Sequence, residues 1–151
     1  MTTDNYFETA EIVTGEIASV LKGIEPAHID AYISALSQAN NVFFVGVGRV
    51  ALALETSVKR LNHIGISACE VGAINEPPIK PGDLLVVGSG SGESLFPRQI
   101  AECAKRYGAT VAHLTSNPAS SIAQLADVVV DFHCGSKAGG GAQRSIQPMT
   151  T

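Results

Sequence analysis

The segment LLVVGSGSGES, residues 84–94, contains the residue types best suited to hold an anion. Branched apolar residues run directly into glycines that alternate with serines. Glycine lets backbone N–H groups converge on a ligand without interference from a Cβ, and the helix expected after this segment adds the positive end of its dipole. With the serine hydroxyl groups, this arrangement suits a phosphate monoester. The residues expected to hold the phosphate are Ser89, Gly90, Ser91, Gly92 and Ser94.

A purely structural explanation of the same segment competes with this one. Glycines and serines are common in turns, and a serine before a helix can cap it by accepting a hydrogen bond from a backbone N–H group. Three serines at such close spacing exceed what one cap needs, which favours the phosphate interpretation. Glu93 argues against it, because its carboxylate would repel a dianion unless the side chain points away.

A second glycine-containing turn, GVGR at residues 46–49, follows an earlier apolar run. In an open parallel sheet, ligands bind beyond the carboxyl ends of the strands, and both glycine turns follow such ends. Gly46, Gly48 and Ala51 also fit the pattern G-x-G-x-x-A, and Glu70 comes about twenty residues later, where an acid that binds a ribose would lie. A dinucleotide-binding protein is therefore an alternative, although it leaves the serine-rich turn unexplained.

Strands that alternate with helices must position these turns. Short runs of branched apolar residues predict strands, and apolar residues at helical spacing between them predict helices. The expected strands are residues 42–47, 67–71, 83–87, 110–114 and 128–132. Because no hairpin turn joins them, they are expected to be parallel, with right-handed crossovers and helices on both faces. The predicted fold class is α/β, with a doubly wound five-stranded parallel sheet.

The two ends of the chain depart from this alternation. Apolar residues recur at steps of three and four over residues 6–24 and again over residues 29–36, which predicts two helices ahead of the first strand. Pro26 suits the first turn of the second helix. Residues 134–147 are rich in glycine and almost free of apolar side chains, which is typical of a mobile loop.

Length, composition and charge limit the classes of protein that fit. A chain of 151 residues with 45% hydrophobic and 16% charged residues is typical of a single globular domain. Only 5% of the residues are aromatic, so the core must rest on Val, Ile, Leu and Ala, as in many buried parallel sheets. A net charge of −4 argues against a nonspecific nucleic-acid surface.

The sequence also bears on the compartment. The amino terminus has neither a basic region nor an apolar core of a signal peptide, and no apolar run approaches the ~18 residues of a membrane span. The three cysteines are odd in number and lack CxxC spacing, which is typical of reduced thiols. We therefore expect a cytoplasmic protein without membrane contact.

Five segments carry a recognisable pattern: VGVGR (residues 45–49), RLNHIG (60–65), PPIKPGDLLVVGSGSGES (77–94), TSNP (115–118) and LADVVV (125–130). Together they resemble the sugar isomerase (SIS) domain family. They occur in the expected order over nearly the whole chain, and SGSGES followed by TSNP is fairly specific for this domain. Within the family, the chain most resembles the 6-phospho-3-hexuloisomerases.

The resemblance implies a flavodoxin-like sheet that binds phosphosugars and a chain that assembles into homodimers or homotetramers. It implies that Ser89, Ser91 and Ser94 hold the phosphate, while Gly46 and Gly48 line the sugar site. The related hexuloisomerases interconvert arabino-3-hexulose 6-phosphate and fructose 6-phosphate, downstream of formaldehyde fixation in the ribulose monophosphate pathway. They need neither a metal nor a nucleotide, so the implied partner is a small sugar phosphate and no cofactor is expected.

The chain departs from the family pattern in two places. Family members commonly carry a glutamate near the position of Ala73, and they continue past the equivalent of residues 147–149 into a terminal helix that brings a further glutamate. Here the sequence ends at Thr151. We therefore expect a single SIS domain over residues 1–151 that lacks the C-terminal helix and could bind its ligand yet turn over poorly.

Isomerisation requires a group that moves protons. Shifting a carbonyl from C3 to C2 through an enediol needs a base near neutral pKa and a donor for the developing oxyanion. His63 is the first candidate, although a histidine at the end of a predicted helix also simply favours the helix dipole. Arg49, beside the first glycine turn, is expected to steady the enediolate or the sugar hydroxyls. Gln147 is expected to close over the ligand if the glycine-rich segment becomes ordered.

The other histidines have weaker positional claims. His28 and His133 lie outside the glycine turns, and His113 falls within a predicted strand, where a core or edge residue is expected. If the serines hold the sugar from one side, the acid–base group must reach it from the other, and a second copy of the chain is one way to supply it. A sensor that binds a phosphosugar without chemistry is the alternative from another functional class.

Overall fold

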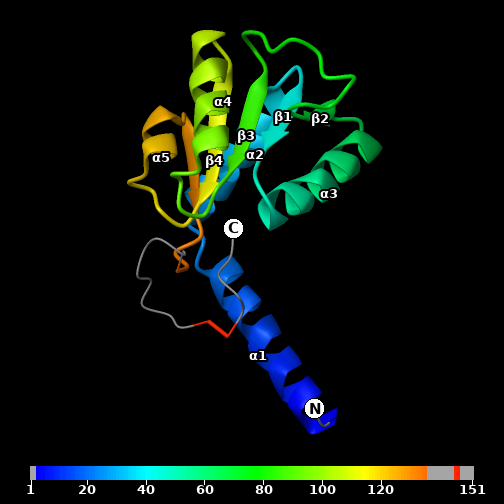
Figure 1. Ribbon diagram of the computed structural model, residues 1–151, viewed down its shortest axis with the longest axis vertical. Helices are drawn as coiled ribbons and strands as arrows, with labels where there is room; N and C mark the ends of the chain where they lie inside the picture. Colours follow the sequence, from blue (N-terminus) through cyan, green and yellow to red (C-terminus); the bar gives the residue numbers. More distant parts are fainter. Residues whose placement is uncertain (1–2, 136–144, 147–151) are drawn as a thin grey trace.

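The computed structural model describes residues 3–135 and 145–146. Two helices precede a sheet in which strands alternate with helices (Figure 1). The helices are α1 (Thr3–Lys22), α2 (Pro26–Gln38), α3 (Arg49–His63), α4 (Leu95–Arg106) and α5 (Ser121–Leu125). The strands are β1 (Val42–Val45), β2 (Ala68–Glu70), β3 (Leu84–Gly88), β4 (Thr110–Thr115) and β5 (Val128–Asp131).

The five strands form one parallel sheet in the order β2-β1-β3-β4-β5. The central strands β1 and β3 are buried over their whole length. This explains why they read in the sequence as unbroken apolar runs instead of an alternating pattern. The predicted doubly wound α/β fold is confirmed, and each strand lies within about two residues of its expected position.

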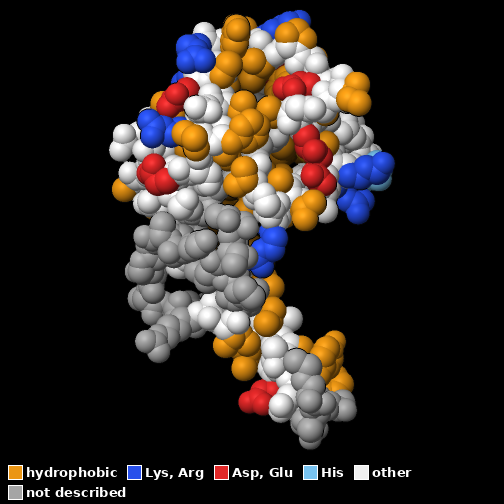
Figure 2. All heavy atoms as spheres, viewed as in Figure 1, with side chains coloured by type: hydrophobic (Ala, Val, Ile, Leu, Met, Phe, Trp, Pro, Cys, Tyr) orange, Lys and Arg blue, Asp and Glu red, His pale blue; other side chains and the backbone are white. Residues whose placement is uncertain are grey.

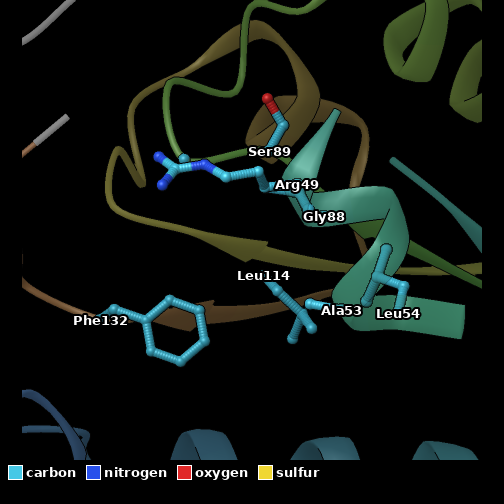
Figure 3. A pocket seen from close by; sticks show the side chains of 9 residues that line it. Arg49, Ala53, Leu54, Gly88, Ser89, Leu114 and Phe132 are labelled. Carbon is cyan, nitrogen blue, oxygen red and sulfur yellow. The ribbon is translucent and has the colours of Figure 1, made fainter. Parts of the chain in front are cut away.

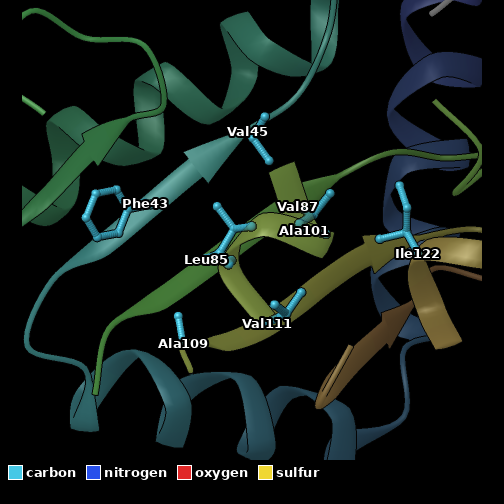
Figure 4. Close-up of a cluster of buried hydrophobic side chains, with 9 residues drawn as sticks. Phe43, Val45, Leu85, Val87, Ala101, Ala109, Val111 and Ile122 are labelled. Carbon is cyan, nitrogen blue, oxygen red and sulfur yellow. The ribbon is translucent and has the colours of Figure 1, made fainter. Parts of the chain in front are cut away.

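Two apolar layers enclose the sheet. On one face, α2 and α3 pack over Val42, Phe44, Leu84 and Val86. On the other face, α4 and α5 contribute Ala101, Ala104 and Ile122 to a cluster with the alternate residues of the same strands (Figure 4). Successive side chains of a strand point to opposite faces, so each strand feeds both layers. Small alanines on α4 let that helix lie close to the sheet.

Local signals in the sequence account for where the helices begin and end. Pro26 occupies the first turn of α2, where its missing N–H group would have no helical partner. Gly65 and Gly108 follow α3 and α4 with φ of +87° and +78°, a left-handed conformation that glycine adopts without strain. These three positions match the helix boundaries expected from the sequence.

The long helix α1 extends away from the sheet and its covering helices (Figure 1). The apolar stripe predicted for it is present, but several of its large side chains are exposed, among them Tyr6 at 67% and Ile17 at 48%. Figure 2 shows hydrophobic side chains on the surface of this helix. On the face shown in Figure 2, Lys and Arg side chains are interspersed with Asp and Glu. In the part of the chain that the structure describes, no helix is both long and apolar enough to cross a membrane.

Candidate functional site

The candidate site lies at the carboxyl edge of the sheet, where the chain leaves β1 and β3 in opposite directions. After β1 the chain enters α3 on one face, and after β3 it enters α4 on the other. In sheets of this strand order, the crevice between these two strand ends is where ligands bind. Both glycine turns singled out in the sequence follow these two strands, so the fold brings them to one edge.

A pocket of about 390 Å³ opens at this edge. Arg49 and Ser89 lie on one side of it, and Leu114 and Phe132 lie on the other (Figure 3). Arg49 and Ser89 thus lie opposite an apolar wall, and the hydroxyl group of Ser89 is directed away from that wall. That division suits a ligand with an anionic end and a carbon skeleton. The remaining lining residues are Val50, Ala53, Leu54, Gly88 and Gly90.

The serine-rich turn is built around Ser89. This residue is only 4% exposed, and its Oγ lies 3.1 Å from the Oγ of Ser94. Ser94 stands at the N-cap position of α4 but makes no capping hydrogen bond with its side chain. The structural explanation, in which the serines serve to cap the helix, therefore does not account for Ser94. The contact between these two hydroxyl groups instead joins the start of the turn to its end.

Gly92 shapes this turn and does not line the pocket. Its φ is +67°, and a Cβ built there would overlap the side chain of Ser120. Its N–H group already donates to the carbonyl oxygen of Ser89 at 3.1 Å and lies 3.2 Å from the Oγ of Ser89. Gly92 therefore fixes the path of the backbone, and its N–H group is hydrogen-bonded within the turn.

Two backbone N–H groups of the turn remain open. Among the described residues, none accepts a hydrogen bond from the N–H of Gly90 or of Ser91. The carbonyl oxygen of Gly90 accepts from the N–H of Ser116 and from the hydroxyl of Thr115, at 3.0 and 3.2 Å. The neighbouring loop therefore holds Gly90 by its oxygen, while its N–H group has no acceptor among the described residues. Successive free amides of this kind form an anion-binding concavity.

The carboxylate of Glu93 is directed away from these amides. Its Oε1 accepts a hydrogen bond from the N–H of Ser121 at 2.8 Å, at the start of α5. That backbone hydrogen bond is the main reason that the pKa of Glu93 lies below its ordinary value. The objection that Glu93 would repel a phosphate is thereby answered, because its charge is engaged at another helix.

The first glycine turn borders a different, smaller cavity. Gly46 lines a space of about 50 Å³ together with Glu70 and Phe96. A Cβ on Gly46 would come within 3.1 Å of the backbone nitrogen of Ala51, so the turn requires glycine for the close approach of α3. Gly48 precedes α3 with φ of +58° and is exposed. Gly46 and Glu70 are thus neighbours, as the dinucleotide alternative also expects.

The structure separates the two predicted catalytic residues. Arg49 begins α3 at the carboxyl edge of the sheet, whereas His63 ends the same helix. A 15-residue helix spans about 21 Å, so His63 lies near the opposite edge of the sheet within one chain. Gln147, predicted to close over the ligand, lies outside the described residues.

Residues that the sequence did not nominate also shape the site. Leu114 and Phe132 end or follow β4 and β5 and form the apolar wall of the pocket. His113 is fully buried beneath the serine-rich turn, with its Nδ1 3.0 Å from the carbonyl oxygen of Val87. Burial lowers the pKa of His113, so this imidazole is neutral in the folded protein near pH 7. The places of Leu114 and Phe132 near strand ends follow from the sequence, but their meeting in one pocket depended on the strand order.

The described residues contain no cluster of metal-ligating side chains. Within residues 3–135 and 145–146, no group of three or more His, Cys, Asp and Glu side chains is arranged to hold a metal ion. Residues Cys69, Cys103 and Cys134 are free thiols, and burial is the largest cause that raises the pKa of Cys69 to about 11. The polar groups gathered at the pocket are therefore hydroxyl, amide and guanidinium groups.

The SIS domain profile matches residues 35–151 of the chain. The chain belongs to the SIS domain family. The matched region contains both glycine turns, the pocket and all five strands. The resemblance inferred from the sequence motifs is thus confirmed, and the structure places the SGSGES motif at the carboxyl edge of the sheet.

Two relatives are similar to this chain over most of its length. The chain is 35% identical over 144 residues to a 3-hexulose-6-phosphate isomerase of Mycobacterium gastri, covering 95% of this chain and 72% of that protein. It is 36% identical over 141 residues to the 3-hexulose-6-phosphate isomerase of Bacillus subtilis (strain 168), covering 93% and 76%. The chain therefore spans about three quarters of the length of these two relatives.

Solved structures agree with the fold. A crystal structure of a hypothetical protein superposes with a TM-score of 0.79 at 30% identity, covering 83% of this chain and 67% of that one. A Methanococcus jannaschii protein, for which the function of 3-hexulose-6-phosphate isomerase has been inferred, superposes with a TM-score of 0.77 at 23% identity, covering 87% and 76%. At that identity, the second comparison supports the fold alone.

Proposed function

We propose that this SIS-domain chain is a phosphosugar isomerase that interconverts 3-hexulose 6-phosphate and fructose 6-phosphate. The observation that carries the proposal is the pair of open amides at Gly90 and Ser91, beside the pocket formed by Ser89 and Arg49. Relatives that match over most of the chain carry the name of this activity, which supports the choice of substrate.

The phosphate is proposed to bind at the serine-rich turn. The open amides supply directed donors, and the first turn of α4 adds the positive end of the helix dipole. Ser91 adds a hydroxyl hydrogen, because its Oγ already accepts from the N–H of Glu93 at 3.3 Å and is free to donate its own proton. These N–H and O–H groups together supply several hydrogen-bond donors to the oxygen atoms of a dianionic ester.

The sugar is proposed to extend from this turn into the pocket. Its carbon skeleton would lie along Leu114 and Phe132, while Arg49 steadies the negative charge that develops on an oxygen atom of the enediol intermediate. Gly46 and Gly48 would border the sugar from the adjoining turn, and Gln147 remains a predicted contact.

The catalytic role of His63 stays a prediction, and the position of this residue sets a condition on it. Because it lies near the opposite edge of the sheet from Arg49, it can join this site only from a second copy of the chain. The proposal therefore includes a homodimer or homotetramer, as expected from the sequence. The cytoplasmic location inferred from the sequence also stays a prediction.

The test follows binding and turnover on the same preparation. Fructose 6-phosphate is expected to raise the melting temperature, and conversion between the 3-keto and 2-keto sugars should be detectable by NMR. Stabilisation without conversion would favour a phosphosugar sensor. Stabilisation by NAD with indifference to fructose 6-phosphate would favour the dinucleotide alternative and overturn the proposal.

A further inference from the structure

Asp131 and His133 form an ordered pair at the carboxyl end of β5. The Oδ1 of Asp131 accepts a hydrogen bond from the backbone N–H of His133 at 2.8 Å, and its Oδ2 lies 3.0 Å from the Nδ1 of the same residue. The side chain of Asp131 is 8% exposed, whereas that of His133 is 50% exposed. A buried carboxylate thus contacts His133 at two points, one on its backbone and one on its solvent-facing imidazole.

The backbone of His133 is unusual. Among the residues that the structure describes, it is the one non-glycine residue with positive φ, at +51°. A left-handed conformation is unfavourable for residues with a Cβ, and when it persists it is often found at functional sites. Here the two contacts from Asp131 hold it in place, so the conformation is fixed by the pair.

Contacts through Thr115 and Ser116 connect the segment around this pair to Gly90 of the serine-rich turn. Thr115 is the partner of Asp131 in the sheet register and donates its hydroxyl hydrogen to the carbonyl oxygen of Gly90. Ser116 donates its N–H to that same oxygen, and its Oγ lies 3.0 Å from the Sγ of Cys134. Asp131 and Cys134, which lie on either side of His133 in the sequence, therefore each neighbour a residue that donates a hydrogen bond to the carbonyl oxygen of Gly90.

The spacing suits a six-carbon phosphosugar. The phosphate turn follows β3, and β5 lies two strands away, at about 10 Å given roughly 4.8 Å between neighbouring strands. In a hexulose 6-phosphate, the carbons that exchange the carbonyl are C2 and C3, at the end of the chain remote from the phosphate. A sugar anchored at Gly90 and directed toward β5 brings these carbons toward His133. His63 has no such route within one chain.

We propose that His133, oriented by Asp131, is an acid–base residue of the isomerisation, an inference that rests on the proposed function. Its Nε2 takes the proton from C2 of the 3-hexulose phosphate, the C–H electron pair becomes the C2–C3 double bond, and the carbonyl oxygen on C3 takes a proton from water. The enediol then loses the proton of the hydroxyl on C2 to water, while Nε2 returns a proton to C3. Proton uptake equals proton release, and no electrons leave the substrate.

Asp131 acts as a positioning residue in this scheme. By accepting from Nδ1–H, its carboxylate selects the tautomer in which Nε2 carries a lone pair, and it stabilises the imidazolium that forms when Nε2 takes up a proton. Among the described residues, no partner for Nε2 of His133 is found. The nitrogen that must meet the substrate is thus the one left open.

The test measures exchange of the C3 proton of fructose 6-phosphate with deuterium from D₂O. H133N keeps a residue that tolerates the left-handed backbone but cannot accept the proton, and it should lower the exchange rate roughly 10²–10⁴-fold with KM unchanged within about twofold. D131N should lower kcat at least about tenfold with a similar KM. Added imidazole should restore part of the rate in H133G, which a purely structural role would not allow.

Two matched substitutions serve as controls. H28N changes a histidine on α2, and D127N changes a carboxylate at the other end of β5 that binds Lys105, so both should leave kcat unchanged. An exchange rate in H133N equal to that of the wild type would overturn the role of His133 alone. So would a raised KM together with a lowered kcat that imidazole does not restore. A wild-type chain that neither binds nor exchanges fructose 6-phosphate would instead overturn the proposed function, and with it this role.

Discussion

Val50 occupies the space that a side chain at Gly88 would fill. A Cβ built on Gly88 would lie 2.6 Å from the Cγ1 of Val50 and 2.9 Å from the Cδ1 of Leu54. This close approach sets α3 directly against the end of β3, so that Arg49 at the start of α3 shares a pocket with Ser89. The glycine at position 88 is therefore part of what assembles the site.

G88A is expected to destabilise the fold by about 1–3 kcal/mol, because an extra methyl group in a filled space displaces Val50 and Leu54. Chemical denaturation measures the loss. G15A is the control, since Gly15 lies within α1 with no atom within 4 Å of a built Cβ. There, alanine should add roughly 0.5–1 kcal/mol through its higher helix propensity. A stability of G88A equal to that of the wild type would contradict this packing.

S91A is expected to weaken binding of fructose 6-phosphate about ten- to a hundredfold, equivalent to roughly 1.5–3 kcal/mol for a hydrogen bond to a charged group. Titration calorimetry measures the affinity. Ser37 provides the matched control, because its exposed hydroxyl bonds only within α2, to the carbonyl oxygen of Ile33 at 2.8 Å. S37A should bind as the wild type does. Unchanged affinity in S91A would remove this hydroxyl from the phosphate site.

His113 should make stability depend on pH. Burial holds its folded-state pKa below the ordinary value of 6.5, so the unfolded chain takes up a proton first as the pH falls. The free energy of unfolding should therefore decrease as pH drops below about 6.5, by at most about 1.4 kcal/mol per pH unit for this one group.

H113N isolates this contribution. Its amide nitrogen can replace Nδ1 as the donor to the carbonyl oxygen of Val87, while no titrating group remains. Denaturation at pH 8 measures the packing loss alone, since both forms of the protein are then neutral at this position. Between pH 7 and pH 5, the wild type should lose more stability than H113N. Equal slopes for the two proteins would show that burial of His113 does not affect its titration.

Much of the fold followed from local patterns in the sequence. The runs at Val42–Val45 and Leu84–Gly88 are buried on both faces, and such strands need apolar residues at every position, which makes them visible in the sequence. Gly65 and Gly108 marked helix ends because only glycine adopts positive φ freely there. The phosphate turn was equally visible, since its glycines and serines lie within a few residues of one another.

The arrangement of the site depended on contacts between distant residues. Which strand ends meet is decided by strand order, and this brings Phe132 and Leu114 to one pocket although a helix separates them in the chain. His63 matched the expected chemistry by residue type, but the length of α3 carries it to the other edge.

His133 is the opposite case, because its place in the proposed site follows from tertiary contacts and not from its residue type. Asp131 orients it only because β5 pairs with β4 in one register, which turns the carboxylate inward and places it beside Thr115. Residue types and short spacings are local properties, so the sequence by itself determined the family, the strands and the anion-binding turn. The direction and neighbours of a side chain depend on packing across the whole sheet, and only the tertiary structure decided which groups can reach the ligand.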